Sequence, residues 1–225
     1  MRILQEGSGS PRPLLLVYHS NASKDAAIVQ ATSSNALVVN DTRTDHYVTV
    51  PPLYTTISEL SSQVGAALSP IVLAGFSEGG LVTKSLLDRG ADPDTLIIAD
   101  GTYGSDYASW KRYADRAKRG ERVMLASYSA GTDRPWRGLV AVTGMPLKFG
   151  PDLPQPAKWV DGNLTVFGYG DGDHSKQGAV VLPQMISSAF SHIVVPPTRS
   201  TSRIVPILAV GTLLGTAAAV AYNWK

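Results

Sequence analysis

The chain has 225 residues, enough for one domain of about 200 residues and a short extension. Its net charge is +2 and its basic residues are scattered, which argues against a nucleic-acid partner. There is no cysteine, so disulfides, thiolate metal sites and cysteine nucleophiles are excluded. A hydrophobic content of 44% is sufficient for a substantial core.

Apolar runs and helical patterns alternate along the first half of the chain. The opening residues lack the apolar core of a secretory signal and predict a short strand followed by a loop. A capping-box match at Thr56 predicts the start of a helix, which Ser69-Pro70 would end. The elements expected in this half are strands over 14–18, 36–40 and 71–74, and helices over 56–68 and 78–89.

The same alternation continues in the second half. Ser105 is a candidate cap for the first helix there, and Gly120 a candidate end. The expected elements are strands over 95–99, 122–126 and 164–167, helices over 106–118 and 180–191, and a long irregular stretch over 130–162. Repeated strand–helix units predict an α/β fold, with a mostly parallel sheet covered by helices on both faces.

Residues 204–222 form a run of 19 without a charge. As a helix rising about 1.5 Å per residue, the run spans about 28 Å, close to the hydrocarbon thickness of a bilayer. A buried core helix is the alternative, but such helices rarely run this long without a charged position. We therefore expect a globular domain over 1–192, a linker over 193–203 and a transmembrane helix over 204–222.

This topology predicts a membrane-anchored protein whose domain lies in the cytoplasm, because no secretory signal precedes it. Gly211 and Gly215 form the G-x-x-x-G pattern with which two membrane helices pack closely, so a homodimer would be possible through this face.

The sequence Gly75-Phe76-Ser77-Glu78-Gly79 is the most informative motif. An apolar run precedes this Gly-x-Ser-x-Gly pattern and a helical pattern follows it at once. That context is typical of a nucleophile elbow, a sharp strand-to-helix turn that presents the serine at the edge of a sheet. Ser77 is therefore the candidate nucleophile.

A serine nucleophile needs a base to take its proton and an acid to orient that base. Among the four histidines, His174 follows the last expected strand and is the candidate base; the alternative is an exposed loop histidine. Asp100 and Asp133 follow the two preceding strands, and both keep the chain order serine, acid, histidine. Asp100 is favoured because it follows its strand immediately, but Asp133 remains open.

An oxyanion hole needs backbone N–H groups directed at the carbonyl oxygen. One is expected from Glu78, the residue after the nucleophile. The second is expected from the loop after the first buried strand, where Ser20 or Asn21 would contribute. His19 ends that strand, so we expect it to line the pocket or to have a structural role.

At these positions the chain resembles the α/β-hydrolase superfamily: GFSEG, ordered acid candidates, and a histidine after the last strand. The resemblance covers about residues 10–192, although the oxyanion loop lacks the HGGG signature of many lipases. It implies a hydrolase with a serine, histidine and aspartate triad and with no metal or organic cofactor.

The expected function is a membrane-tethered serine hydrolase that cleaves an ester, thioester or amide through an acyl-enzyme. Its substrate would be a small-molecule or lipid-like acyl compound. Two alternatives are a catalytically silent membrane-anchored scaffold with the same fold, and an acyltransferase that uses the same triad.

Overall fold

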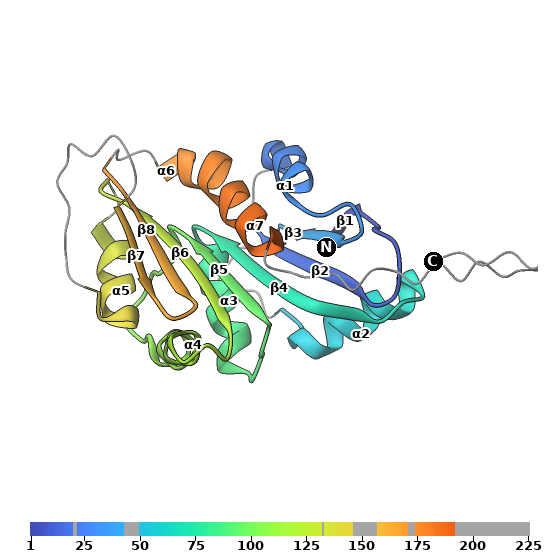
Figure 1. The fold of residues 1–225 in the computed structure, drawn as a ribbon, viewed down its shortest axis with the longest axis horizontal. Helices are drawn as coiled ribbons and strands as arrows, with labels where there is room; N and C mark the ends of the chain where they lie inside the picture. Colours follow the sequence, from blue (N-terminus) through green and yellow to red (C-terminus); the bar gives the residue numbers. More distant parts are fainter. Residues whose placement is uncertain (20–21, 43–49, 132, 146–156, 171–173, 192–225) are drawn as a thin grey trace, which may run out of the picture. The chain divides into compact units, whose positions relative to one another are not determined.

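Eight strands form one sheet at the centre of the fold (Figure 1). The computed structural model describes residues 1–19, 22–42, 50–131, 133–145, 157–170 and 174–191. The strands are β1 (Arg2–Gln5), β2 (Arg12–Tyr18), β3 (Leu37–Asp41), β4 (Leu68–Phe76), β5 (Thr95–Ala99), β6 (Val123–Ser129), β7 (Ala157–Asp161) and β8 (Leu164–Tyr169).

The strands lie in the order β1-β3-β2-β4-β5-β6-β8-β7. All neighbours are parallel except at the two edges, where β1 pairs antiparallel with β3 and β7 with β8. Every residue of β3 and β5 is buried, as expected for parallel strands covered on both faces. The predicted α/β fold with a mostly parallel sheet is therefore confirmed.

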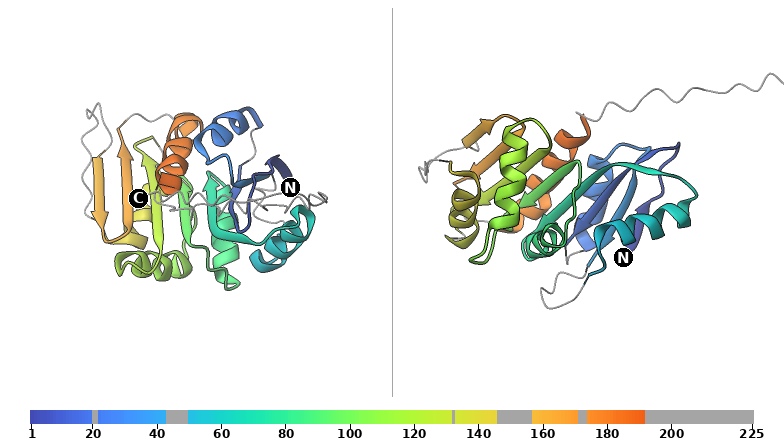
Figure 2. Two further views of the ribbon diagram at one scale, coloured as in Figure 1. Left: turned by 45° about the vertical axis from the view of Figure 1, so that its right-hand side comes forward. Right: turned by 90° about the horizontal axis from the view of Figure 1, so that it is seen from below.

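Helices cover both faces of this sheet (Figures 1 and 2). Helices α1 (Asp25–Ala31) and α7 (Leu182–Ser191) pack on one face through residues such as Ile28 and Ile186. On the other face, side chains such as Leu86 and Trp110 complete a larger core. The helices there are α2 (Leu53–Val64), α3 (Gly79–Asp88), α4 (Ala108–Lys118) and α5 (Asp133–Thr143).

Three short helical segments precede α1 and α7. A 3₁₀ turn, η1 (Ala22–Lys24), precedes α1. The turn α6 (His174–Lys176) leads into a π-helical segment, η2 (Gln177–Val181), and then into α7. π-Helical segments are frequent at functional sites, and this one directly follows the turn that carries His174.

The strand order reverses between β2 and β4. From β2 the chain moves outward to β3, and from β4 it moves the other way to β5 and β6. In open α/β sheets, ligands bind in the crevice at the carboxyl ends of the strands where the order reverses. The end of β4, and therefore the GFSEG turn, lies at this switch point.

Two predicted helix starts are wrong. Helix α2 begins at Leu53 rather than at Thr56, whose side chain is 1% exposed and whose backbone N–H bonds to the carbonyl of Pro52. Helix α4 begins after Tyr107, and Asp106 rather than Ser105 accepts a hydrogen bond from its first turn. Ser69-Pro70 lies inside β4, so it does not directly end the preceding helix, as the sequence predicted.

The expected irregular stretch over 130–162 is also wrong, because it contains α5 and β7. Pro135 falls in the first turn of α5, where a missing N–H costs little. Gly138 lies in the same helix. Its backbone packs so closely against Thr102 that a Cβ would be 2.2 Å from the Thr102 carbonyl oxygen, so this position requires glycine. Strand β7 returns to β8 through a turn in which Gly162 has φ +59°.

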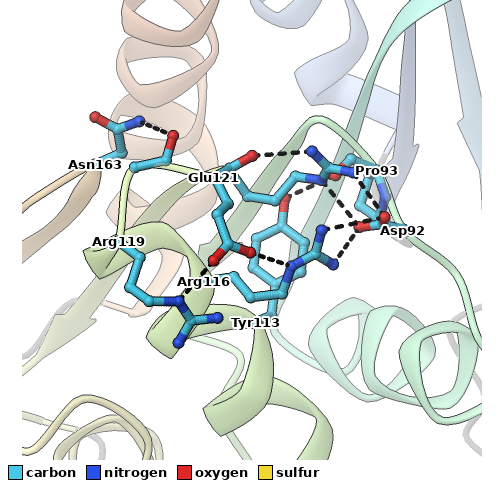
Figure 3. A network of polar contacts seen from close by, with 9 residues as sticks. Asp92, Pro93, Tyr113, Arg116, Arg119, Glu121 and Asn163 are labelled. Carbon is cyan, nitrogen blue, oxygen red and sulfur yellow. Dashed lines mark hydrogen bonds and ion pairs between the residues drawn. The ribbon is translucent and has the colours of Figure 1, made fainter.

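A network of ion pairs joins the elements at the amino ends of β5 and β6 (Figure 3). Asp92 accepts hydrogen bonds from Arg116 on α4 and from Arg122, which precedes β6. Glu121 accepts hydrogen bonds from Arg116 and Arg119. This network lies away from the carboxyl ends of the strands, so it belongs to the scaffold.

The described residues all belong to one compact unit. Among the described residues, no helix combines the length and apolarity needed to cross a bilayer. The predicted linker over 193–203 and the predicted span over 204–222, with Gly211 and Gly215, lie outside the described ranges.

Candidate active site

Ser77 lies on a sharp turn between β4 and α3. Its φ is +54°, in the left-handed region that residues other than glycine rarely adopt. Two glycines allow the turn to close. A Cβ on Gly75 would be 2.5 Å from the carbonyl oxygen of Gly79, and one on Gly80 would be 2.0 Å from that of Gly101. The local geometry is that of a nucleophile elbow, and it presents the hydroxyl at the sheet edge.

His174 contacts both Ser77 and Asp100. Its Nε2 is 2.9 Å from Ser77 Oγ, and its Nδ1 is 2.5 Å from Asp100 Oδ2. The carboxylate can only accept, so Nδ1 donates and Nε2 has its lone pair directed at the serine hydroxyl. The structure therefore brings together three of the predicted residues from the ends of β4, β5 and β8.

Asp100 is fully buried, with 0% exposure, and immediately follows β5. Its φ is +45°, and its backbone N–H donates to the carbonyl of Ser127 on β6. The carboxylate accepts hydrogen bonds from the N–H and the hydroxyl of Ser129, at 3.3 and 3.0 Å. These donors stabilise a charged carboxylate facing His174.

Asp133, the other candidate acid, is the first residue of α5. Its side chain lies outside the described part of the structure. Among the described side chains, Asp100 is therefore the candidate acid that contacts His174.

The segment that carries His174 is held from two sides. The imidazole stacks on Phe76, with ring centroids 4.9 Å apart. Three residues further on, buried Gln177 accepts a 2.7 Å hydrogen bond from Ser127. Because Ser127 also binds the backbone of Asp100, one residue of β6 links the acid and the histidine segment.

Phe76 is also covered by a lysine. The Lys24 ammonium lies 3.9 Å from the centroid of the Phe76 ring, and burial lowers the pKa of this lysine. A Cβ on Gly178 would be 2.4 Å from the same ammonium. Phe76 therefore packs against both Lys24 and His174.

Of the residues predicted to donate N–H groups to the oxyanion, the structure describes Glu78. Glu78 precedes the first residue of α3, and the N–H groups at such a helix start have no intrahelical acceptor. Its side chain is exposed. Ser20 and Asn21 lie outside the described residues. The structure therefore places one of the expected donors at the elbow.

His19 has a different environment from Ser77. It is buried, and its Nε2 is 3.3 Å from Oδ1 of Asp25. The same carboxylate accepts a 2.9 Å hydrogen bond from Asn40 and pairs with Arg2. These contacts favour the structural role among the two that the sequence left open. His46 and His192 are outside the described ranges.

Tyr103 is a site residue that the sequence analysis missed. It lies in the loop after β5, near Ser77. Burial raises the pKa of the Tyr103 phenol, while the nearby Ser77 side chain acts in the opposite direction. The tyrosine lies three residues after Asp100, in the same loop, but no sequence pattern indicates the direction of a loop side chain.

The sequence matches no protein-family model and no curated protein. A 2,6-dihydroxy-pseudo-oxynicotine hydrolase aligns with 86% of this chain at 14% identity and a TM-score of 0.53. This chain spans 63% of that hydrolase's length. TT1662 from Thermus thermophilus aligns over 85% of this chain and 96% of its own, at 17% identity and a TM-score of 0.44. The Vlm2 thioesterase domain aligns over 86% and 98%, at 13% identity and a TM-score of 0.43.

The first of these likenesses covers 86% of this chain, whose sheet is mostly parallel and carries the serine turn at its switch point. The chain therefore has the fold of the α/β-hydrolase superfamily.

Proposed function

We propose that this protein is a serine hydrolase that cleaves an ester, thioester or amide through an acyl-enzyme. The observation that supports this most is the line of contacts from Ser77 Oγ through His174 to Asp100, at 2.9 and 2.5 Å. A serine hydroxyl needs this arrangement of base and acid to become a nucleophile at neutral pH.

In the first step, the Ser77 hydroxyl proton moves to Nε2 of His174 while Oγ forms a bond to the substrate carbonyl carbon. The electron pair of the C=O bond moves to oxygen, where the N–H of Glu78 stabilises the charge. When the tetrahedral intermediate collapses, the leaving group takes the proton from Nε2. Asp100 keeps Nδ1 protonated and stabilises the transient imidazolium.

In the second step, water repeats the sequence on the acyl-enzyme. His174 takes a proton from the water, and the resulting hydroxide bonds to the acyl carbon. Ser77 Oγ then leaves and recovers its proton from Nε2. If an alcohol or thiol replaced the water, the same triad would perform an acyl transfer, which is the second candidate reaction.

The fold alone assigns no substrate, because one fold hosts many activities. We propose a small or lipid-like acyl substrate because the uncharged run over 204–222 supports attachment to a membrane, which would raise the local concentration of membrane-bound substrate.

The test is hydrolysis of a short-chain p-nitrophenyl ester by Ser77→Ala. We expect turnover to fall by about 10⁴-fold or more, because no other group replaces the nucleophile. Ser85→Ala, at an exposed position of α3, is the matched control and keeps full activity. If Ser77→Ala were folded and as active as the wild type, the proposal would be wrong. A wild type without activity on any acyl ester would favour the silent scaffold.

A further inference from the structure

We infer that Gln177 is a positioning residue of the candidate active site. Its hydrogen bond to Ser127 on β6 holds the segment that carries His174 in line with the other two candidate triad residues. The inference rests on the proposed serine chemistry, in which the imidazole must take the proton of the nucleophile.

The hydrogen bond between these two residues is buried. Ser127 Oγ donates to Gln177 Oε1 over 2.7 Å, and each residue is 1% exposed. Ser127 belongs to β6, whereas Gln177 is the first residue of η2. The bond therefore joins the π-helical segment to the sheet, three residues after His174.

Gln177 is an unfavourable residue for a position that serves packing alone. Within the parts of the chain that the structure describes, its Nε2 has no hydrogen-bond partner. A buried amide donor without a partner destabilises a fold, and apolar side chains at 127 and 177 would avoid that penalty. What glutamine supplies here is the oxygen that accepts from Ser127.

Ser127 also holds the candidate acid. It pairs with Ala99 in the sheet, and its carbonyl accepts the backbone N–H of Asp100 over 2.9 Å. One residue of β6 therefore binds the acid through its backbone and the histidine segment through its side chain. Both attachments start from a strand inside the sheet, so they fix the separation that the 2.5 Å contact between His174 Nδ1 and Asp100 requires.

The contact of this segment with Phe76 is less directional. His174 stacks on the Phe76 ring with centroids 4.9 Å apart, and a Cβ on Gly178 would be 2.7 Å from the same ring. Ring contacts keep a segment close but tolerate sliding, whereas a hydrogen bond requires both a distance and a direction. We therefore assign the position of the imidazole along the ring to the bond between Ser127 and Gln177.

Loss of this bond would let the imidazole shift relative to Ser77 Oγ, which is 2.9 Å from His174 Nε2. Proton transfer needs a base within hydrogen-bond reach, and a displacement of about 1 Å can lower a rate by about 10²-fold. Gln177 is too buried to contact a substrate. The effect should therefore appear in kcat and not in KM.

The experiment compares Gln177→Met, Ser127→Ala and the double variant with wild type in the hydrolysis of p-nitrophenyl acetate. The first variant removes the acceptor at similar side-chain length, and the second removes the donor. We expect each to lower kcat by about 10–100-fold, with KM changed by less than about threefold. The double variant should be within about threefold of the slower single variant, because all three lack the same hydrogen bond.

Tyr113→Phe is the matched control. It removes a buried hydroxyl that donates to the carbonyl of Pro93 over 2.9 Å, before the amino end of β5. We expect it to lower the melting temperature by a similar amount and to keep kcat within about threefold of wild type.

A second measurement follows the imidazole directly. The proton on His174 Nδ1, bonded to the Asp100 carboxylate, should give a low-field signal in the proton NMR spectrum. We expect this signal in wild type and in Tyr113→Phe. In Gln177→Met and Ser127→Ala it should broaden or disappear, because a less firmly held imidazole exchanges this proton faster with water.

The inference would be overturned if folded Gln177→Met or Ser127→Ala kept the wild-type kcat, or if the loss appeared only in KM. Multiplied losses in the double variant would also overturn it, because the two residues would then act independently. If Gln177→Met did not fold, Ser127→Ala would decide the question. A wild type without esterase activity contradicts the proposed function itself, whereas the NMR comparison still tests the positioning role, so the two failures are distinguishable.

Discussion

At the scale of single residues, backbone strain coincides with the candidate chemistry. Among the described residues, Ser77 and Asp100 are the only two non-glycine positions with positive φ, at +54° and +45°. Each such conformation costs about 1–3 kcal/mol and persists only where the surroundings impose it. For Ser77 the surroundings are the close backbone approaches at Gly75 and Gly80. For Asp100 they are its hydrogen bonds to β6. The fold therefore tolerates strain where it presents the candidate nucleophile and the candidate acid.

The identity of the acid gives a residue-scale prediction. We expect Asp100→Asn to lower kcat by about 10³–10⁴-fold, because an amide cannot hold the imidazole tautomer that leaves Nε2 free to accept. Asp133→Asn should stay within a few-fold of wild type. Steady-state kinetics on a p-nitrophenyl ester, with melting temperatures to confirm folding, provides the comparison. A large loss in Asp133→Asn and a small one in Asp100→Asn would reverse the assignment.

The sequence could predict Ser77 and His174 as candidates, because motif and chain order place them at strand ends. It could not choose between the two aspartates. That choice depends on Ser129, whose N–H and hydroxyl receive the Asp100 carboxylate from the neighbouring strand. Such a contact exists only once β5 and β6 are paired.

At the scale of elements, the site is assembled from three strand ends that lie far apart in the sequence. Ser77 follows β4, Asp100 follows β5 and His174 follows β8. The strands were predictable because buried parallel strands are short apolar runs. Helix α5 and strand β7 were not, because α5 contains both a proline and a glycine and β7 alternates between exposed and half-buried positions at the sheet edge.

The ion-pair network around Asp92 gives an element-scale prediction that is separate from catalysis. Hydrogen bonds from Arg122, then from Arg116, lower the pKa of Asp92 from 3.8 to about 2. A folded-state pKa below the unfolded value stabilises the protein above about pH 3.8, and this stabilisation is lost as the pH falls through about 2.

We therefore expect Asp92→Asn to lower the free energy of unfolding by about 1 kcal/mol at pH 7, after allowance for solvent screening of this half-exposed carboxylate. The difference from wild type should shrink as the pH falls from 4 to 2. Urea unfolding at a series of pH values measures it, with Asp115→Asn as the control, because Asp115 has only a 3.9 Å pair with Lys111. Equal stability of Asp92→Asn and wild type at pH 7 would show that the network contributes nothing.

At the scale of the whole molecule, the double winding of the sheet determines where chemistry can occur. The reversal of strand order between β2 and β4 opens the crevice at which Ser77 projects, while ion pairs stabilise the opposite ends of the strands. The overall class was predictable from the alternation of strands and helices. The position of the crevice was not, because it depends on the order of strands in space.

The proposed membrane attachment is also a property of the whole chain. We expect the full chain to sediment with membranes and to resist extraction by alkaline carbonate, since an uncharged run of 19 residues favours insertion. A version that ends at residue 192 should remain in the supernatant. If the full chain were released by carbonate, attachment through 204–222 would be wrong.

Locating the covalent intermediate tests the proposed role of Ser77 most directly. The full-length protein is treated with a fluorophosphonate, digested and analysed by mass spectrometry, with Ser77→Ala and Asp100→Asn treated in parallel. We expect one adduct, on Ser77, that is absent from Ser77→Ala and forms at least 100-fold more slowly in Asp100→Asn. An adduct on another residue, or a folded wild type that forms none, would contradict it.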